Sequence, residues 1–301
     1  MLSIVIPVLN EIHTLPIVLV AVSGVLPDVD KEILLVDDGS VDGTREWIET
    51  NFPVGQSAAS SMEIGSDGNL VCGRDPSLAQ IKVRALYHER SRGKGAGLRT
   101  GLAEATGNVI VIQDADLEYD PRDWAPMYDL IVNQHVAQVV YGSRFEGERM
   151  GRARFISFPQ VAANRLISTL FGALFWKRIS DIEVCYKMFT KEVNDTLDIT
   201  CADFGCEIQM SAQIVRSDRW KICEVPISYR GRTFEEGKKI NWRDGLKAIG
   251  YLLWFRVCRS PARAPAPVQS TIPTSNVRHA PALNPPAVAT QHATPSAIGE
   301  N

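Results

Sequence analysis

Short apolar runs alternate with helix-forming segments along the first half of the chain. Five runs rich in Val, Ile and Leu are typical of buried parallel strands. They occupy Leu2–Leu9, Glu32–Val36, Val83–Tyr87, Val109–Gln113 and Val136–Tyr141. Helices are predicted between them at Thr14–Leu26, Thr44–Asn51 and Gly97–Ala105. Strands separated by helices of this length predict right-handed βαβ units, and hence an α/β fold with a doubly wound, mostly parallel sheet and flanking helices.

The pattern changes after Tyr141, where helical segments become longer and extended segments fewer. Helices are predicted at Gln160–Phe175, Phe204–Val215 and Trp242–Phe255. Extended segments are predicted at Ile182–Phe189 and Ile222–Ser228. We expect this second half to build an acceptor site against a nucleotide-binding first half.

Two segments depart from the α/β pattern. Residues 53–82 are rich in Ser, Gly, Asp and Asn, so we interpret them as an insertion that could contain a small hairpin. Eight of the 17 prolines follow Ser260, among Ala, Thr, Ser and Val and without any aromatic residue. Such a composition buries too little apolar surface to offset chain entropy. We therefore expect one domain over residues 1–258 and a disordered Pro/Ala-rich tail over residues 259–301.

Charge and cysteine usage exclude several classes of protein. The 301 residues carry 32 basic and 35 acidic side chains, a near-balance that argues against a nucleic-acid partner. Six scattered cysteines form no Cys-x-x-Cys pair, and no signal peptide is apparent, so we expect a cytoplasmic protein that is not secreted. The uncharged run Thr14–Pro27 is shorter than the ~20 residues of a membrane span, and polar residues interrupt Phe155–Trp176.

Polar clusters follow three of the predicted strands, at Pro7–Glu11, Asp37–Ser40 and Asp114–Asp116. In doubly wound sheets, ligands bind at the carboxyl ends of the strands. Asp114 and Asp116 can both reach one hard cation such as Mg²⁺ or Mn²⁺, and Glu118 could add a third oxygen. Taken alone, Asp38–Ser40 also fits a tight turn, and Asp114–Asp116 also fits a helix cap before Pro121.

These motifs together resemble a family 2 glycosyltransferase with the GT-A fold. The resemblance extends from Leu2 to Phe255 and is interrupted mainly by the insertion. Its first-half motifs are Pro7–Glu11, Val36–Thr44, Gly93–Gly95, Asp114–Leu117 and Tyr141–Arg144. In the second half, Asp181–Phe189, Glu224–Tyr229 and Arg230–Lys239 are similar to the dolichyl-phosphate mannose or glucose synthase branch. The sequence departs from well-known members of that branch in two respects: we expect no C-terminal membrane helices, and it carries the insertion.

The resemblance implies a role for each motif residue. Nucleotide-sugar binding is implied for Pro7, Asn10, Glu11, Asp38, Lys94, Asp114 and Arg144. A divalent metal, Mg²⁺ or Mn²⁺, is implied at Asp114, Asp116 and Glu118. Contacts to the acceptor or its phosphate are implied for Arg165, Arg232, Lys238 and Lys239. Arg144 suits a phosphate because its guanidinium fork matches phosphate oxygens.

The catalytic residues implied are Asp181, Arg144 and Arg232. An inverting transfer to a hydroxyl needs a base, and Asp181 ranks before Glu183 and Glu207 for that role. A structural capping role for Asp181 stays open. A phosphate acceptor is already anionic and needs only positioning and charge compensation.

The favoured function is inverting transfer of a hexose from a nucleotide-diphosphate sugar to polyprenyl phosphate, dolichyl or undecaprenyl, at the cytoplasmic membrane face. An alternative keeps this donor but uses a soluble or glycan hydroxyl acceptor. A nucleotidyltransferase would need a Gly-rich loop after the first strand, and Pro7–Glu11 contains no glycine. A non-catalytic nucleotide-sugar binding module is a further alternative. An NAD dehydrogenase is disfavoured because no Gly-x-Gly-x-x-Gly follows the first strand.

A helical stripe offers a route to a lipid acceptor. Apolar residues recur at spacings of three and four at Leu166, Ile167, Leu170, Phe171, Leu174 and Phe175. Trp176, Lys177 and Arg178 follow, an aromatic residue and two cations suited to an anionic headgroup zone. Two interpretations stay open: the stripe packs on the sheet, or it makes a peripheral contact with an anionic membrane and presents Arg165 to the acceptor phosphate.

Overall fold

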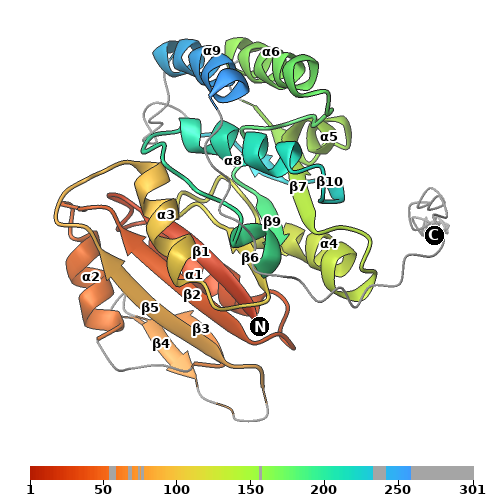
Figure 1. Cartoon of the computed structure of the whole chain (residues 1–301). Coiled ribbons are helices and arrows are strands. Elements are labelled where there is room, and N and C mark those ends of the chain that lie inside the picture. Colours follow the sequence, from red (N-terminus) through yellow and green to blue (C-terminus); the bar gives the residue numbers. More distant parts are fainter. Residues whose placement is uncertain are drawn as a thin grey trace, which may run out of the picture. The chain divides into compact units, whose positions relative to one another are not determined.

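The central feature of the fold is a seven-stranded sheet in the order β10-β7-β9-β6-β1-β2-β5 (Figure 1). The structure, a computed structural model, describes residues 1–53, 59–66, 70–73, 75, 78–155, 158–232 and 242–258. Six strands of this sheet run parallel: β1 (Leu2–Val8), β2 (Lys31–Asp37), β5 (Ile81–Tyr87), β6 (Val109–Ile112), β7 (Val139–Ser143) and β10 (Ile222–Pro226). The seventh, β9 (Lys187–Thr190), lies between β6 and β7 and is antiparallel to both. The predicted mostly parallel α/β fold is confirmed.

Helices connect the strands and cover the sheet. They are α1 (Leu15–Gly24), α2 (Thr44–Asn51), α3 (Lys94–Glu104), α4 (Trp124–Tyr128), α5 (Arg144–Arg149), α6 (Phe158–Phe175), α7 (Lys191–Asn194), α8 (Gly205–Arg216) and α9 (Trp242–Val257), with short turns η1 (Pro121–Asp123) and η2 (Asp129–Asn133). Right-handed crossovers put α1 and α2 on one face of the sheet and α3 on the other. Figure 1 shows α6 and α9 side by side above α8. Among the described residues, no helix combines the length and the apolar character that crossing a bilayer requires.

The bounds of three predicted elements differ most from the prediction. Extended structure was predicted over Ile182–Phe189, but the strand β9 begins only at Lys187, because the preceding residues form an irregular segment beside the site. The strand β7 begins at Val139 rather than Val136, since His135 adopts a positive φ of 52° just before an exposed Val136. The helix α3 starts at Lys94, three residues earlier than predicted.

Glycines in α3 allow this helix to pack closely against its neighbours. A Cβ atom at Gly95 would lie 2.1 Å from the carbonyl oxygen of Cys201, and one at Gly101 would lie 2.4 Å from Cγ1 of Val5. The close packing of α3 against β1 and the residues before α8 therefore requires glycine at both positions. The backbone amide of Gly95 also donates to the carbonyl of Ala202 at 2.8 Å. The first turn of α3 is thereby tied to the second half of the chain.

The insertion at residues 53–82 contains the predicted hairpin. The strands β3 (Ser61–Ile64) and β4 (Leu70–Gly73) pair antiparallel. β3 packs against α1, and Met62 is buried there. The end of the predicted insertion belongs to the main sheet, since β5 begins at Ile81. The predicted tail at residues 259–301 lies outside the described residues. A further short parallel pair joins β8 (Ala153–Arg154) to β11 (Tyr229–Arg230).

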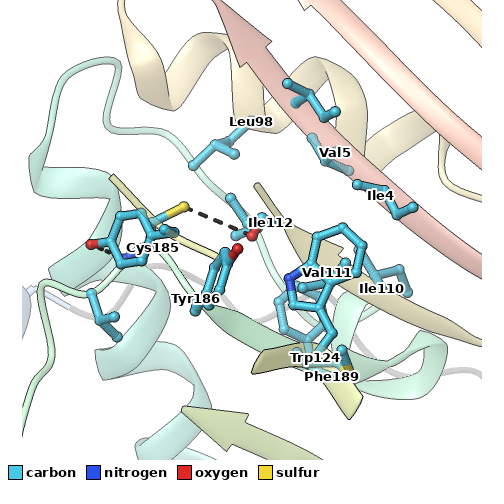
Figure 2. Packing of buried hydrophobic residues seen from close by; sticks show 14 of the residues in the cluster. Ile4, Val5, Leu98, Ile110, Val111, Ile112, Trp124, Cys185, Tyr186 and Phe189 are labelled. Atoms are coloured by element: carbon cyan, nitrogen blue, oxygen red, sulfur yellow. Dashed lines mark hydrogen bonds between the residues drawn. The ribbon is translucent and has the colours of Figure 1, made fainter. Parts of the chain in front are cut away.

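The hydrophobic core lies on both faces of the central strands. Figure 2 shows Ile4 and Val5 of β1 beside Leu98 of α3, with Trp124 and Phe189 packed below β6. These side chains are buried completely, and each such burial contributes about 1.5–3 kcal/mol. The core fixes β1 and β6 next to each other, which is where the strand order reverses. Their carboxyl ends therefore form the crevice in which ligands of doubly wound folds bind.

Candidate active site

A cavity of about 680 Å³ opens at the carboxyl ends of β1, β2 and β6. Most of the residues implicated by the sequence line it: Pro7, Glu11, Asp38, Lys94, Asp114, Asp116, Glu118, Arg144 and Arg232. The side chains of α6, α8 and α9 complete the wall from the second half of the chain. Three implicated residues, Asn10, Asp181 and Arg165, are not part of the lining. Lys238 and Lys239 lie outside the described residues.

Asp38, at the end of β2, is the best-satisfied carboxylate of the site. It accepts hydrogen bonds from Ser91 Oγ at 2.8 Å, from the Arg92 amide at 3.0 Å and from the Gly93 amide at 2.8 Å. His88 Nδ1 lies 2.6 Å from its Oδ1. Burial by itself raises the pKa of Asp38, but these bonds outweigh it and hold the pKa below its usual value. The carboxylate thus holds the loop that leads into Lys94.

Asn10 and Glu11 organise the turn after β1. Asn10 adopts a positive φ of 55°, and its side-chain oxygen accepts from the Val41 amide at 2.9 Å. Its own backbone amide donates to Ser40 Oγ at 2.9 Å. Glu11 accepts from Thr14 Oγ1 at 2.7 Å, and its carboxylate lies 3.5 Å from Arg232 Nη1. Asn10 therefore shapes the loop, whereas Glu11 reaches the cavity.

The carboxylates after β6 are crowded, and each is paired with a cation of the chain itself. Lys94 Nζ lies 2.9 Å from Asp114 Oδ1 and 3.0 Å from Oδ2. Arg232 Nη2 lies 3.0 Å from Asp116 Oδ2. Glu118 accepts from Tyr229 Oη and from the Arg232 amide, both at 2.9 Å. Burial, followed by the charges of Asp114 and Glu118, raises the pKa of Asp116 to about 7.

This acidic group fits a hard divalent cation. The described residues hold no preformed cluster of three or more His, Cys, Asp or Glu arranged around a metal position. However, Asp114, Asp116 and Glu118 offer only oxygen ligands, as Mg²⁺ and Mn²⁺ prefer. Burial, and after it the repulsion from Asp114 and Glu118, raises the pKa of Asp116, and a bound cation would offset both effects. The three residues that could hold the metal are therefore those that the sequence indicated.

Arg144 and Asp181 form a buried, bidentate ion pair. Arg144 Nε lies 2.7 Å from Asp181 Oδ2, and Nη2 lies 2.8 Å from Oδ1. The Arg144 amide also donates to Asp181 at 3.2 Å. Asp181 is completely buried and does not line the cavity, which disagrees with the predicted role of a base that touches substrate. The geometry instead gives Asp181 the task of orienting Arg144, whose guanidinium lines the cavity.

Comparisons with known proteins identify the family. The model of Glycosyl transferase family 2 matches residues 3–56 and 76–198, which together make up more than half of the chain. The chain belongs to this family. It is therefore an enzyme of the glycosyltransferase class, and the resemblance noted from its motifs is confirmed.

The relatives of this glycosyltransferase include enzymes named for undecaprenyl phosphate. It is 25% identical to undecaprenyl-phosphate mannosyltransferase of Micrococcus luteus over 267 residues, covering 85% of this chain and 94% of the relative. It is 24% identical to undecaprenyl-phosphate 4-deoxy-4-formamido-L-arabinose transferase of Salmonella paratyphi A, covering 78% of this chain but only 62% of that relative.

Solved structures support the fold of the glycosyltransferase. Glucosyl-3-phosphoglycerate synthase from Mycobacterium tuberculosis, in complex with Mn²⁺, UDP-glucose and phosphoglyceric acid, is similar with a TM-score of 0.58. The identity is 20%, and the match covers 85% of this chain and 79% of that one. At this identity the likeness concerns the fold, and the predicted GT-A fold is confirmed.

The hydrogen bond between Asn164 and Glu183 in the glycosyltransferase cavity was not predicted from the sequence. Glu183 lines the cavity beside Asn164 of α6. In the orientation of the Asn164 amide that satisfies its neighbours, its nitrogen donates to Glu183 Oε2 at 2.9 Å and its oxygen accepts from Arg144 Nη2 at 3.3 Å. Burial raises the pKa of Glu183 to about 7. Asn164 interrupts the apolar pattern of its helix, which is the signal that could have identified it.

Of the two interpretations left open for the stripe on α6, the structure supports packing against the core. Ile167 and Phe171 are buried, and Leu170, Leu174 and Phe175 pack against the core, so most of the stripe faces inward. Leu166 and Trp176 are exposed. Arg165 is also exposed: its Nη2 lies 2.9 Å from Glu148, and its guanidinium lies over the Phe145 ring. The structure therefore does not bring Arg165 to the cavity.

Proposed function

We propose that this glycosyltransferase moves a hexose, with inversion, from a nucleotide-diphosphate sugar to polyprenyl phosphate at the cytoplasmic face of a membrane. The observation that carries the proposal is the two-part character of the cavity. One part of its lining is a cluster of charged side chains that includes Lys94, Asp114, Asp116 and Arg232. Another part consists largely of apolar residues of α6 and α9: Pro159, Ala163, Leu166, Ile167, Ala248 and Ile249. An anionic head joined to a hydrocarbon tail suits such a cavity.

The donor end supplies charge compensation. Asp114, Asp116 and Glu118 would hold Mg²⁺ or Mn²⁺, which when bound offsets the negative charge of the departing diphosphate. Lys94 and Arg232 add positive charges of the chain itself at the same end. Asp38 fixes the loop before Lys94 and so sets the position of that ammonium.

The acceptor end needs to orient a nucleophile. A phosphate oxygen of the acceptor attacks the anomeric carbon, its bond to carbon forms on one face, and the bond to the diphosphate oxygen breaks on the other. No proton has to be removed, because the phosphate is already anionic. Arg144 is held in place by Asp181, and its buried guanidinium suits the acceptor phosphate. The names of the relatives support the same acceptor class.

One observation favours a second candidate, transfer to a hydroxyl. The carboxyl group of Glu183 faces the cavity and has a pKa raised by burial to about 7, as suits a general base near neutral pH. In this candidate Glu183 takes the hydroxyl proton, a role for which Asp181 is too deeply buried.

A donor panel tests both candidates. UDP-glucose, GDP-mannose and UDP-N-acetylglucosamine are incubated with Mn²⁺ and either undecaprenyl phosphate or soluble sugars, and products are read by mass spectrometry. We expect a hexosyl-phosphate lipid with one of these donors, and none with Asp116→Asn. Glycosylated soluble sugar without any lipid product would reject the lipid acceptor and favour the second candidate.

Peripheral membrane contact is the finer part of the proposal. Trp176 is 87% exposed after α6, and Leu253 and Trp254 of α9, the latter 61% exposed, lie on the neighbouring helix. Tryptophan favours the headgroup zone of a bilayer. We expect the full chain to co-sediment with anionic liposomes at low salt. The double substitution Leu253→Ser, Trp254→Ser should reduce this binding, whereas Val71→Ser on the exposed β4 strand should not. Unchanged binding of the double variant would contradict this docking surface.

A further inference from the structure

We propose that the Lys94 ammonium is paired with Asp114 when no metal is bound. When a divalent cation binds Asp114 instead, Glu207 acts as a positioning residue and takes over the pairing with Lys94. This inference rests on the metal site of the proposed function. It concerns Glu207, which the sequence analysis considered only as a lower-ranked candidate for the base, and gives this residue a different role.

Lys94 bridges two carboxylates that come from different halves of the chain. Its Nζ atom lies 2.9 Å from Asp114 Oδ1 and 3.2 Å from Glu207 Oε1. Asp114 follows β6, and Glu207 lies on α8. All three side chains line the same cavity. The ammonium therefore has two partners within reach and can favour either one.

Glu207 is held rigidly on its other side. Its Oε2 atom is ion-paired with Lys187, whose side chain is completely buried and lies 5.4 Å from the centre of the Tyr141 ring. Lys187 also donates to the carbonyl oxygen of Val184. Glu207 Oε1, by contrast, is a buried oxygen without any hydrogen bond among the described residues, apart from the longer ion pair with Lys94. This oxygen has spare capacity to accept the ammonium.

The physical reason for such an arrangement is the cost of leaving a charge unpaired. A divalent cation that binds Asp114 must displace an ammonium that is largely excluded from water. A buried ammonium without a partner costs several kcal/mol. Lys94 has a flexible four-carbon stem, so it can turn from one carboxylate to the other. Glu207 thereby lowers the free energy needed to clear Asp114 for the metal.

Arg232 differs from Lys94 in this respect. Its guanidinium contacts Asp116, Glu118 and Glu11 at 3.0 to 3.6 Å, all of them at the acidic end of the cavity. It has no described carboxylate partner away from that end. The transfer of a cation to a second carboxylate is therefore specific to the Lys94 side.

The test measures Mn²⁺ binding to the full chain without donor, by electron paramagnetic resonance of free Mn²⁺. Lys94→Met removes the competing ammonium and should tighten Mn²⁺ binding about tenfold. Glu207→Gln removes the charge that receives the ammonium and should weaken it about tenfold. In the double variant Lys94→Met, Glu207→Gln, the effect of Glu207→Gln should disappear, because Glu207 acts only through Lys94.

Two further variants guard against trivial effects. Glu207→Gln leaves Lys187 without its buried partner, so Glu207→Gln, Lys187→Met removes both charges and should weaken Mn²⁺ binding as Glu207→Gln does. Lys191→Met removes an exposed ammonium paired with Asp195 away from the cavity and should leave Mn²⁺ binding unchanged. Circular dichroism confirms that each variant is folded.

Each outcome is decisive. The proposal is overturned if Glu207→Gln weakens Mn²⁺ binding equally with and without Lys94. It is also overturned if Glu207→Gln does not weaken Mn²⁺ binding at all. Absence of Mn²⁺ binding by the unsubstituted chain also overturns it. If the expected pattern appears but the donor panel yields no lipid product, the proposed acceptor fails while this inference stands. If lipid product forms but the Mn²⁺ effects are additive, only this inference fails.

Discussion

Asp38 and Asp116 are the same residue type at the same edge of one sheet, yet their surroundings are opposite. Asp38 follows β2 and is surrounded by donors, including His88, Ser91 and two backbone amides. Asp116 follows β6 and is surrounded by acceptors, with Asp114 and Glu118 as neighbours and Arg232 as counter-ion. The pKa of Asp38 is lowered, whereas that of Asp116 is raised to about 7.

The difference shows how environment divides two tasks between identical side chains. A carboxylate whose lone pairs are filled by the protein stabilises a loop. A carboxylate that repels its neighbours favours a cation or a proton. The position after a strand predicts that a residue lies near the ligand, but not which of these tasks it performs.

The largest expected effect is at the acidic side of this comparison. Asp116→Asn should lower the transfer rate roughly a thousandfold, because under the proposed function a metal bound there would supply several kcal/mol of charge stabilisation. The fold should be retained, since the substitution relieves repulsion. Transfer assays measure the rate. The melting temperature shows that the variant is folded, and its rise on adding Mn²⁺ shows whether the variant still binds the metal. Asp129→Asn, on the surface near η2, is the matched control. Normal turnover in Asp116→Asn, or in the unsubstituted enzyme with chelator, would contradict the metal role.

The second largest effect is expected at Asp38, where substitution should lower the stability of the fold. Asp38→Asn should lower the free energy of unfolding by about 2–3 kcal/mol, because hydrogen bonds to a charged acceptor contribute about this much. Urea denaturation of the two variants measures the contrast. Asp116→Asn should not be destabilised. Equal stabilities for both variants would remove the distinction between the two carboxylates.

The α/β architecture and the main site motifs could be predicted because they depend on local patterns. β1, β2 and β6 are continuous apolar runs, and polar clusters follow them directly. The short helices α4, α5 and α7 were not predicted, since four to six residues carry too little periodicity.

Pairings between distant residues could not be predicted. Arg144 pairs with Asp181, which is 37 residues away in the sequence, and Lys187 pairs with Glu207, which is 20 residues away. Helix and strand periodicity relates only residues that are close in the sequence, so it predicts neither pair. The resemblance implied both Asp181 and Arg165 as site residues. Burial against Arg144 removes Asp181 from the cavity, and the surface pair with Glu148 removes Arg165. Which charges neutralise each other is a property of the packed fold.

A third prediction extends the comparison to Glu183, whose pKa is raised by burial to about 7. The unfolded chain has a value of about 4.3 at this residue. The folded state therefore binds the proton of Glu183 more tightly than the unfolded state does. The contribution of this proton to the free energy of unfolding is fully present below about pH 4 and is lost as the pH rises through about 7. Glu183→Gln should flatten the pH dependence of unfolding between these limits. Parallel profiles for both proteins would contradict the raised pKa.

The smallest expected effect is the contribution of Asp38 to the loss of stability at low pH. Its pKa is lowered in the folded state, so its contribution is present above the unfolded value of about 3.9 and is lost as the pH falls through the folded value. Below pH 4 the unfolding free energy of the unsubstituted enzyme should fall more steeply than that of Asp38→Asn. Chemical denaturation between pH 2.5 and about 5 measures the two slopes.

The reversed strand β9 has a consequence for how this enzyme could change in evolution. Because β9 is antiparallel to β6 and β7, its beginning lies at the edge where its neighbours end. The segment just before it therefore reaches this edge without belonging to any βα connection, and its Glu183 lines the cavity while its Asp181 is buried against Arg144. Under the proposed function, substitutions there would alter acceptor choice while the loops after β1, β2 and β6, which are proposed to bind the donor, stay untouched. The direction of one strand would then make the two substrate specificities separately adjustable.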